Sequence, residues 1–319
     1  MRCVAVTGAS GFIGSTLVAA LAEMGWQVRA LTRSRDAARR LEQDGVQTIL
    51  GSLTQPEALV ELVADADAVV HCAGTVRGAV YEDFAATNVV GTKNLLAAMT
   101  DRPLPLVALS SLAAREPELS DYARSKRAME TVLAKTTVLA KTSASAATLV
   151  LRPPAVYGPG DRELKPLFDA FARGIAPLPG PLDARVSLLY VDDLAAAIVA
   201  WLAASEHVGG VYEISDGEPG GYSWEQVVAT AERLLQRRIR RVRLPTTALA
   251  GVARINRRMS QWMGYAPMLT PGKLAELRHA DWVCNNTPLQ RVLDWAPRIG
   301  LDSGLQRTCG WGAAARRES

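Results

Sequence analysis

The sequence predicts an α/β fold, in which a doubly wound parallel sheet is followed by a smaller α/β C-terminal domain. Two observations predict it. Short apolar runs alternate with helical patterns through the first half of the chain, which is typical of a parallel sheet covered by helices on both faces. A glycine-rich turn also follows directly after the first apolar run. The length of 319 residues and the hydrophobic content of 49% suit a globular protein with a large core.

The glycine-rich turn has the arrangement that binds a phosphate group. Gly8, Gly11 and Gly14 come after the apolar strand pattern Cys3–Val6 and before a helical pattern. Glycine lets the backbone approach a phosphate, the N-terminus of the helix directs free N–H groups toward it, and the third glycine lets helix and strand pack closely. We therefore expect a Rossmann-type dinucleotide site, the alternative being an ordinary strand-to-helix turn. The residues expected to contact the dinucleotide are Gly8, Ser10, Gly11, Phe12, Ile13 and Gly14.

The other elements of the predicted sheet follow in order, each marked by its hydrophobic period. The predicted strands are residues 3–6, 26–31, 46–50, 68–71, 104–109 and 148–151, with helices near 36–43, 56–64, 82–99 and 121–142. Within the last helix, residues 131–136 are repeated by residues 137–142. Because six residues do not complete a whole number of helical turns, we expect the second copy to be an exposed helix extension or a loop.

From Arg152 onward, prolines interrupt the chain and the pattern changes. We divide the sequence into a dinucleotide-binding domain, residues 1–157, and a substrate-binding domain, residues 158–319, with residues 186–205 returning to the first domain. The elements predicted in this second part are strands at 185–191, 211–214 and 240–244 and helices at 192–202 and 224–236.

Composition and charge exclude several classes of function. The net charge of +4 is mildly basic. Its arginine cluster, residues 237–243, is expected to be a solvated helix end leading into an edge strand, rather than a site for anionic lipid or nucleic acid. No window reaches the ~20 apolar residues of a membrane span, so we expect no stable membrane insertion. Scattered cysteines and histidines predict neither disulfides nor a metal site and indicate a reducing, cytoplasmic location.

A second motif indicates proton transfer. Tyr122 and Lys126 stand four residues apart, on one face of the predicted helix 121–142. A lysine charge beside a phenol would lower the pKa of the phenol, and such a tyrosine can exchange a proton with a carbonyl or alcohol oxygen. Ser110 and Ser111 end the preceding strand, where a serine could hydrogen-bond the same oxygen. The alternative is a surface helix turn, because this spacing is common by chance.

These motifs occur in an order that resembles the extended short-chain dehydrogenase/reductase superfamily, also called the NAD-dependent epimerase/dehydratase family. The resemblance runs to about residue 193 and implies a Rossmann-type sheet and an enzyme that uses NAD(H) or NADP(H). The matching stretches are Thr7-Gly-Ala-Ser-Gly-Phe-Ile-Gly14, Ser110-Ser111, Tyr122-x-x-x-Lys126, Arg152-Pro-Pro-Ala-Val-Tyr-Gly-Pro-Gly160 and Tyr190-Val-Asp-Asp193.

The resemblance implies a role for each matching residue. Tyr122 would be the general acid/base. Lys126 would hold the nicotinamide ribose and tune Tyr122. Ser111 would polarise the substrate oxygen, with Ser110 the weaker candidate. The other positions expected near the cofactor are Asn88, then Ala73 and Gly74 on the adenosine side, and Arg152 and Gly158 at the nicotinamide end.

The end of the second predicted strand indicates which cofactor is preferred. A carboxylate there would bond the 2′-hydroxyl of NAD and repel a 2′-phosphate. The sequence Leu31-Thr32-Arg33-Ser34-Arg35 has no carboxylate, while Arg33 offers a planar fork suited to phosphate. We therefore expect NADP(H) in preference to NAD(H). The alternative is that Arg33 stacks on adenine.

Two departures from the resemblance bear on the substrate. Members that act on nucleotide sugars would have an asparagine at the position of Ala155 and an arginine at that of Val186. Their loss favours likeness to the hydroxysteroid dehydrogenase and dihydroflavonol reductase-like members. We expect an NADP(H)-dependent oxidoreductase that interconverts an alcohol and a ketone or aldehyde on a small, largely apolar substrate. The alternatives are an NAD-dependent nucleotide-sugar epimerase or dehydratase, and a non-catalytic dinucleotide-binding scaffold.

Two expectations concern packing. The segment 248–269 carries apolar residues and arginines. We expect it to be a helix packed on the core of the small domain. A lid on an apolar substrate is the less favoured alternative, and a membrane-surface role is the weakest one. The resemblance also makes a homodimer through helices 82–99 and 121–142 plausible.

Overall fold

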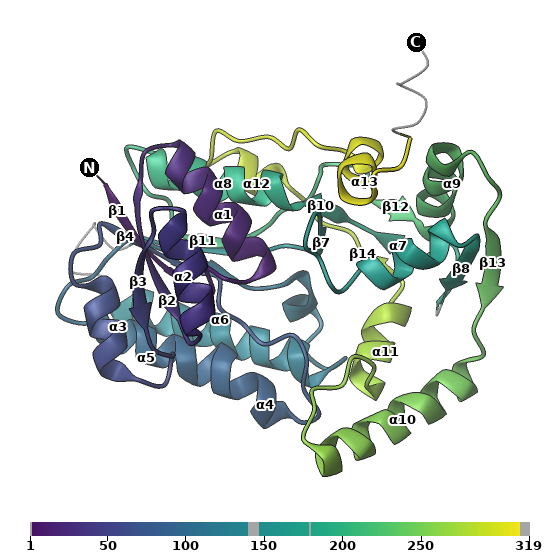
Figure 1. Ribbon diagram of the computed structural model, residues 1–319, viewed down its shortest axis with the longest axis horizontal. Helices are drawn as coiled ribbons and strands as arrows, with labels where there is room; N and C mark the ends of the chain where they lie inside the picture. Colours follow the sequence, from purple (N-terminus) through teal and green to yellow (C-terminus); the bar gives the residue numbers. More distant parts are fainter. Residues whose placement is uncertain (1, 140–146, 179, 313–319) are drawn as a thin grey trace.

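A computed structural model describes residues 2–139, 147–178 and 180–312 of the chain (Figure 1). Its centre is a seven-stranded sheet in which every pairing is parallel, in the order β11-β6-β5-β4-β1-β2-β3. Chain order reverses beside β1, and such a reversal opens a crevice at the carboxyl ends of the strands. The strands are β1 (Cys3–Thr7), β2 (Gln27–Thr32), β3 (Gln47–Leu50), β4 (Ala68–His71), β5 (Leu106–Leu109), β6 (Thr148–Arg152) and β11 (Gly210–Glu213).

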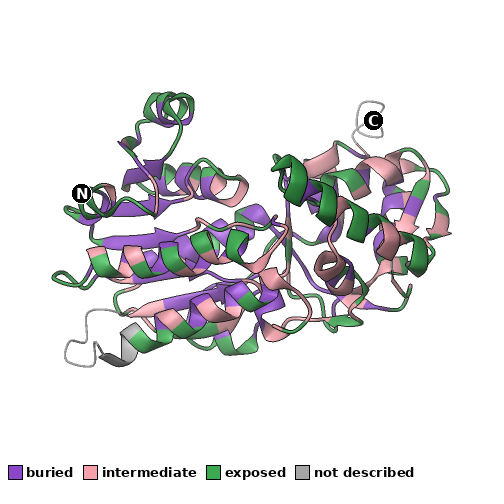
Figure 2. Ribbon diagram, turned by 90° about the horizontal axis from the view of Figure 1, so that it is seen from below, coloured by how far each residue is buried: buried purple, intermediate pink, exposed green. Residues whose placement is uncertain are grey.

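Helices cover both faces of this sheet, which lies buried between them (Figure 2). An apolar core lies on each face of the sheet. Successive side chains of β1 point to opposite faces, so Val4 and Val6 pack into one core and Ala5 into the other. The first face carries α1 (Phe12–Glu23), α2 (Arg35–Gln43), α8 (Val191–Ala203) and α12 (Thr287–Gln290). The second carries α3 (Pro56–Val63), α4 (Tyr81–Ala85), η1 (Ala86–Gly91), α5 (Thr92–Ala98) and α6 (Asp121–Leu139).

Beyond the two faces of the sheet lies a third apolar core, in which Tyr157, Phe171 and Leu305 are completely buried. The remaining strands form three small sheets: β7 (Ala155–Tyr157) with β10 (Leu188–Tyr190), β8 (Ile175–Leu178) with β13 (Arg240–Arg243), and β9 (Arg185–Val186) with β12 (Tyr222–Ser223) and β14 (Asp281–Trp282). The other helices are η2 (Leu112–Arg115), α7 (Lys165–Ala172), α9 (Trp224–Leu235), α10 (Thr246–Met263), α11 (Pro271–Arg278) and α13 (Leu301–Cys309).

Two elements differ from their predicted form, and the described residues cover a third prediction only in part. The single helix predicted at 82–99 is two α-helices joined by the π-helical turn η1, which contains Asn88. The strand predicted at 185–191 is divided at Ser187, because β9 and β10 pair with different strands. The second copy of the six-residue repeat begins within α6, and its residues 140–142 lie outside the described residues.

The sheet also draws on residues beyond the predicted domain boundary at 157. The strand β11 forms one edge of the sheet beside β6, and Leu289, Leu293 and Trp295 pack into the same core as α1 and α8. Segments far apart in the chain therefore complete the first unit. The division at residue 157 itself stays a prediction.

The turn that opens α1 depends on one close backbone approach. Gly8 has φ +76°, and a Cβ there would lie 2.6 Å from the backbone nitrogen of Ala73 at the end of β4. Gly25 has almost the same φ, +75°, but a Cβ there would have no heavy atom within 4 Å. The two glycines therefore separate the cost of backbone conformation from the cost of a clash.

We predict that Gly25→Ala lowers the free energy of unfolding by about 1 kcal/mol, the cost of a positive φ. Gly8→Ala should cost about 1–3 kcal/mol more, because the strand end beside it must also move. Urea unfolding of both variants measures the difference. Equal losses would show that the approach of Gly8 to β4 imposes no steric constraint.

Candidate active site

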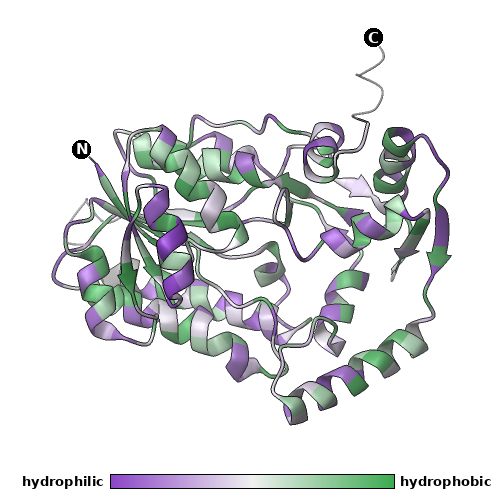
Figure 3. Cartoon of the chain, viewed as in Figure 1, coloured by the Kyte–Doolittle hydropathy of each residue, from purple (hydrophilic) through white to green (hydrophobic). Residues whose placement is uncertain are grey.

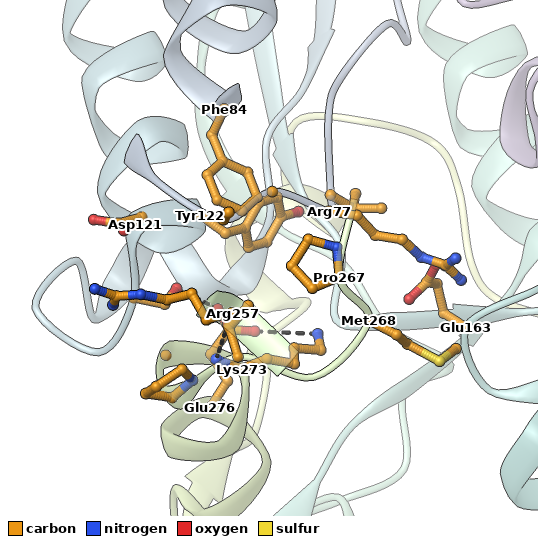
Figure 4. Close-up of a pocket in the computed structure, with 17 residues that line it drawn as sticks. Arg77, Phe84, Asp121, Tyr122, Glu163, Arg257, Pro267, Met268, Lys273 and Glu276 are labelled. Atoms are coloured by element: carbon orange, nitrogen blue, oxygen red, sulfur yellow. Dashed lines mark hydrogen bonds and ion pairs between the residues drawn. The ribbon is translucent and has the colours of Figure 1, made fainter. Parts of the chain in front are cut away.

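A pocket lies beside Tyr122, between the first turn of α6 and the segment that contains α10 and α11. About 510 Å³ of empty space lies within it, a figure that includes space open to solvent. Figure 4 shows Tyr122 beneath the ring of Phe84, with Pro267 and Met268 on the other side of the pocket. The predicted tyrosine therefore faces a cavity that a small molecule can enter.

The hydroxyl of Tyr122 is protonated at neutral pH. Burial raises the pKa of this phenol above its ordinary value, and a side-chain hydrogen bond with Ser111 offsets part of the shift. Ser111 caps the short helix η2, so its side chain is held at the end of β5. This differs from the sequence expectation, in which a neighbouring lysine lowers the pKa of Tyr122.

Lys126 explains the difference, because its ammonium group is directed into the protein. Its Nζ donates a hydrogen bond of 2.9 Å to the carbonyl oxygen of Leu109, the last residue of β5. The side chain is 4% exposed, and burial lowers the pKa of the ammonium group to about 8. A Cβ at Gly74 would lie 3.0 Å from this nitrogen, so the glycine makes room for the lysine.

Asn88 is fixed by three hydrogen bonds at the same place. Its Nδ2 donates to the carbonyl oxygen of Thr75 (3.1 Å) and to Oγ of Ser125 (2.9 Å), while its Oδ1 accepts from the backbone N–H of Thr75 (2.8 Å). The π-helical turn η1 places this residue, and such turns are frequent at functional sites. Asn88 therefore ties the loop after β4 to α6, one residue before Lys126.

His71 belongs to the same buried network, although the sequence did not single it out. Its Nδ1 is hydrogen-bonded to Thr7 (2.7 Å) and its Nε2 to Thr92 (3.0 Å). Burial, together with the charge of Lys126, lowers the pKa of His71 to about 3, so the ring is neutral. Its position at the end of β4 was the one feature of the sequence that could have identified it. A single histidine in a buried strand does not indicate a function by itself.

The glycine-rich turn leaves an uncovered helix N-terminus. Gly11 precedes α1 with no side chain capping the first turn, and Ser10 and Gly11 are exposed. A Cβ at Gly14 would overlap the carbonyl oxygen of Gly8. Phe12 and Ile13 direct their side chains into the apolar cores, so their backbone N–H groups are what the turn offers. Backbone donors and free space together fit a dinucleotide phosphate.

Arg33 lies where the sequence placed it, one residue beyond β2 and exposed. Ser34 caps the helix that follows, accepting a hydrogen bond from the backbone N–H of Ala37 (3.3 Å).

Ala73 and Gly74 follow β4 beside the glycine turn. Gly158 lies next to Phe12, since a Cβ at Gly158 would be 3.6 Å from the ring.

A buried ion pair holds two other candidates away from the pocket. Glu130, on α6, receives two hydrogen bonds from Arg152, of 2.8 and 2.6 Å. Ser110 donates to the same carboxylate at 2.6 Å. These contacts join β5 and β6 to α6, which gives Ser110 and Arg152 a structural partner and leaves Ser111 as the serine beside Tyr122.

The far wall of the pocket includes part of the segment 248–269, for which a lid was only the less favoured alternative in the sequence, and Lys273, which the sequence did not single out. Arg257, Pro267 and Lys273 come from the C-terminal part, which carries no recognisable motif. Four charged residues in the lining form two ion pairs: Arg77 with Glu163 (2.7 Å) and Lys273 with Glu276 (3.2 Å). Across the described residues no group of His, Cys, Asp and Glu side chains could hold a metal ion.

Comparison with known proteins shows which enzymes the chain is similar to. The chain is 35% identical over 314 residues to a ceramide reductase from Caulobacter vibrioides, covering 98% of this chain and 95% of that protein. It is 33% identical over 235 residues to a 2-alkyl-3-oxoalkanoate reductase from Stenotrophomonas maltophilia, covering 67% of this chain and 70% of that protein.

The fold matches that of UDP-glucuronic acid 4-epimerase from Bacillus cereus, a structure in complex with UDP-glucuronic acid and NAD. The TM-score is 0.75 at 19% identity, over 99% of this chain and 100% of that one. The sequence model of the NAD dependent epimerase/dehydratase family matches residues 4–215, which include the glycine turn, Ser111, Tyr122 and Lys126. The chain is an enzyme of the NAD-dependent epimerase/dehydratase family.

Proposed function

We propose that this enzyme is an NADP(H)-dependent oxidoreductase that interconverts a ketone and an alcohol on a largely apolar, lipid-like substrate. The observation that carries the proposal is the position of the Tyr122 phenol, which lines the pocket one helical turn from the buried Lys126. A protonated phenol that lines the pocket is suited to donate its proton to a carbonyl oxygen that is becoming an alcohol, and the phenolate can take the proton back when the alcohol is oxidised.

The roles of the three central residues follow from their positions. Ser111 would donate a hydrogen bond to the substrate oxygen and polarise the carbonyl. Tyr122 would give that oxygen its proton and become a phenolate. Lys126 would hold the nicotinamide ribose, and its hydrogen bond to the carbonyl oxygen of Leu109 keeps the ammonium group in place.

The cofactor site is proposed from the chain's own groups. The backbone N–H groups of residues 10–14 would bind the diphosphate, with Ala73 and Gly74 along the adenosine side and Asn88 and Lys126 near the nicotinamide ribose. A bound nicotinamide would supply a hydride to the carbonyl carbon. Arg33, exposed beyond β2 with no carboxylate between Thr32 and Arg35, supports NADP(H) over NAD(H).

The relatives support an apolar substrate. The pocket offers both kinds of contact, because Phe84, Pro267 and Met268 line it together with charged side chains, four of which form ion pairs. The two relatives at 33–35% identity are reductases named for lipid-type substrates, a ceramide and a 2-alkyl-3-oxoalkanoate. Against a nucleotide-sugar substrate stand Ala155, in place of an asparagine, and the buried Val186, in place of an arginine.

We predict that Tyr122→Phe lowers kcat roughly 10²–10⁴-fold, the usual contribution of a general acid, with little change in NADPH affinity. Turnover is measured as NADPH oxidation with a panel of long-chain ketones, and affinity by NADPH fluorescence titration. Tyr81→Phe, on the neighbouring helix α4, is the matched control and should remain active. Unchanged turnover in Tyr122→Phe would remove the assigned role, whereas loss in both variants would indicate disturbed packing.

The lowered pKa of Lys126 predicts a pH-dependent stability. Its pKa is about 8 in the folded protein and 10.5 when solvated, so the unfolded chain binds more protons between these values and stability rises with pH there. Between pH 7 and pH 10 the free energy of unfolding of the wild type should rise by about 2 kcal/mol relative to that of Lys126→Met. Urea unfolding across this range measures the difference. Lys135→Met, an exposed lysine of α6, should show no such trend, and a flat Lys126→Met difference would contradict the lowered pKa.

Arg33 provides a test of cofactor preference. Losing a charge-assisted contact to a 2′-phosphate should raise the KM for NADPH about tenfold or more in Arg33→Ala, while the KM for NADH stays within about twofold. Arg39→Ala, an exposed arginine of α2, is the control. An equal change for both cofactors would place Arg33 away from the 2′-phosphate.

A further inference from the structure

Helix α10 exposes an apolar face that no other described element covers. Val252, Ile255, Met259 and Met263 are 46–60% exposed, and Trp262 is 89% exposed. Tryptophan is usually well buried in folded proteins, so an indole in this state marks a surface that binds something. The sequence favoured a helix packed on the core of the small domain, and this expectation is wrong for the apolar side of α10.

The exposed residues form one continuous stripe. Positions 252, 255, 259 and 262 follow the three- and four-residue steps that align side chains along one face of a helix. Ala253 and Ser260 are buried and point the other way, toward the rest of the protein, where α10 packs against α11. Figure 3 shows α10 at the edge of the molecule, with hydrophobic and hydrophilic residues in alternation along it.

Positive charge accompanies this stripe. Arg254 and Arg258 are exposed and, by helical position, lie along one border of the apolar face. The surrounding stretch, residues 233–275, contains ten Lys or Arg residues and no Asp or Glu. Some of these arginines are paired elsewhere, as Arg241 is with Glu225 and Glu232, but Arg254 and Arg258 have no ion pair among the described residues. An apolar face bordered by arginines complements an anionic bilayer surface.

The location of α10 connects this face to the active site. Arg257 of α10 lines the pocket beside Tyr122, and Pro267 and Met268, just after the helix, line it too. Figure 4 shows these three residues on the wall opposite Phe84. A surface on which α10 lies would therefore be next to the pocket that receives the substrate.

We propose that α10 is an interfacial helix that docks the enzyme on an anionic lipid bilayer. Ile255, Met259 and Trp262 enter the headgroup region, and Arg254 and Arg258 contact lipid phosphates. No helix of the described chain is long and apolar enough to cross a bilayer, so the helix lies on the surface. A second copy of the chain fits this face less well, because pairing two copies would bring their arginine-rich stretches together without acidic partners. The proposal concerns binding and does not depend on the reaction.

Vesicle sedimentation of the full chain tests it. The wild type should bind vesicles of phosphatidylcholine and phosphatidylglycerol in equal parts, and bind vesicles of phosphatidylcholine alone about tenfold or more weakly. Ile255→Gln/Met259→Gln/Trp262→Gln should weaken binding at least about tenfold, because the apolar contribution is lost. Arg254→Glu/Arg258→Glu should weaken binding to the anionic vesicles by a similar factor. High salt should weaken the binding of the wild type to these vesicles in the same way.

Two matched variants control for general changes in surface character. Met24→Gln/Val60→Gln/Val211→Gln replaces exposed apolar residues elsewhere, and Arg39→Glu/Arg40→Glu reverses exposed charge on α2; both should bind as the wild type does. NADPH affinity should be the same in all variants, so a failed docking proposal is distinguishable from a failed cofactor proposal. Absence of vesicle binding by the wild type, or binding that survives the triple α10 variant, would overturn the proposal. So would a wild-type dimer that this variant converts to a monomer without any vesicle binding.

Discussion

The buried ammonium group of Lys126 is the constraint on which the site depends. A buried charge is tolerated only where polar partners compensate it. Here the carbonyl oxygen of Leu109 accepts its hydrogen bond, and Gly74 leaves the room it needs. Burial, with a smaller contribution from the same charge, keeps His71 neutral. The charge also favours the thiolate of Cys72, whose pKa burial nevertheless raises to about 12. One lysine thus links the ends of β4 and β5 to the helix that carries Tyr122.

Two hydrogen-bond networks fix the position of α6 relative to the sheet. Asn88 joins the helix to the loop after β4, and Glu130 joins it to β5 and β6 through Ser110 and Arg152. Because these contacts lie on opposite sides of Lys126 along the helix, α6 cannot shift along its axis without breaking one of them. The phenol of Tyr122 is therefore positioned by buried polar contacts, while the surrounding pocket is built from a different part of the chain.

The proposed acid and the pocket wall therefore come from different parts of the chain. Tyr122 belongs to the sheet unit, whereas Arg257, Pro267, Met268 and Lys273 come from the α10–α11 segment. Changes in that segment can alter what enters without altering the chemistry at Tyr122. An exposed apolar stripe on the same segment is consistent with a substrate that comes from a lipid surface.

The sequence by itself determined the α/β class, the glycine turn, the presence of the strands β1 to β6 along the chain and the Tyr122–Lys126 pair. Each of these is a local pattern whose physical meaning, a hydrophobic period, a tight turn or a helical spacing, needs no distant partner. Only the tertiary structure decided that β11 closes the sheet edge, that Asn88 lies in a π-helical turn, and that Lys126 faces Leu109 rather than lowering the pKa of Tyr122. It also decided that α10 presents its apolar face outward. These outcomes depend on which segments meet in space, and a hydrophobic period shows that a helix has an apolar face without showing what covers it.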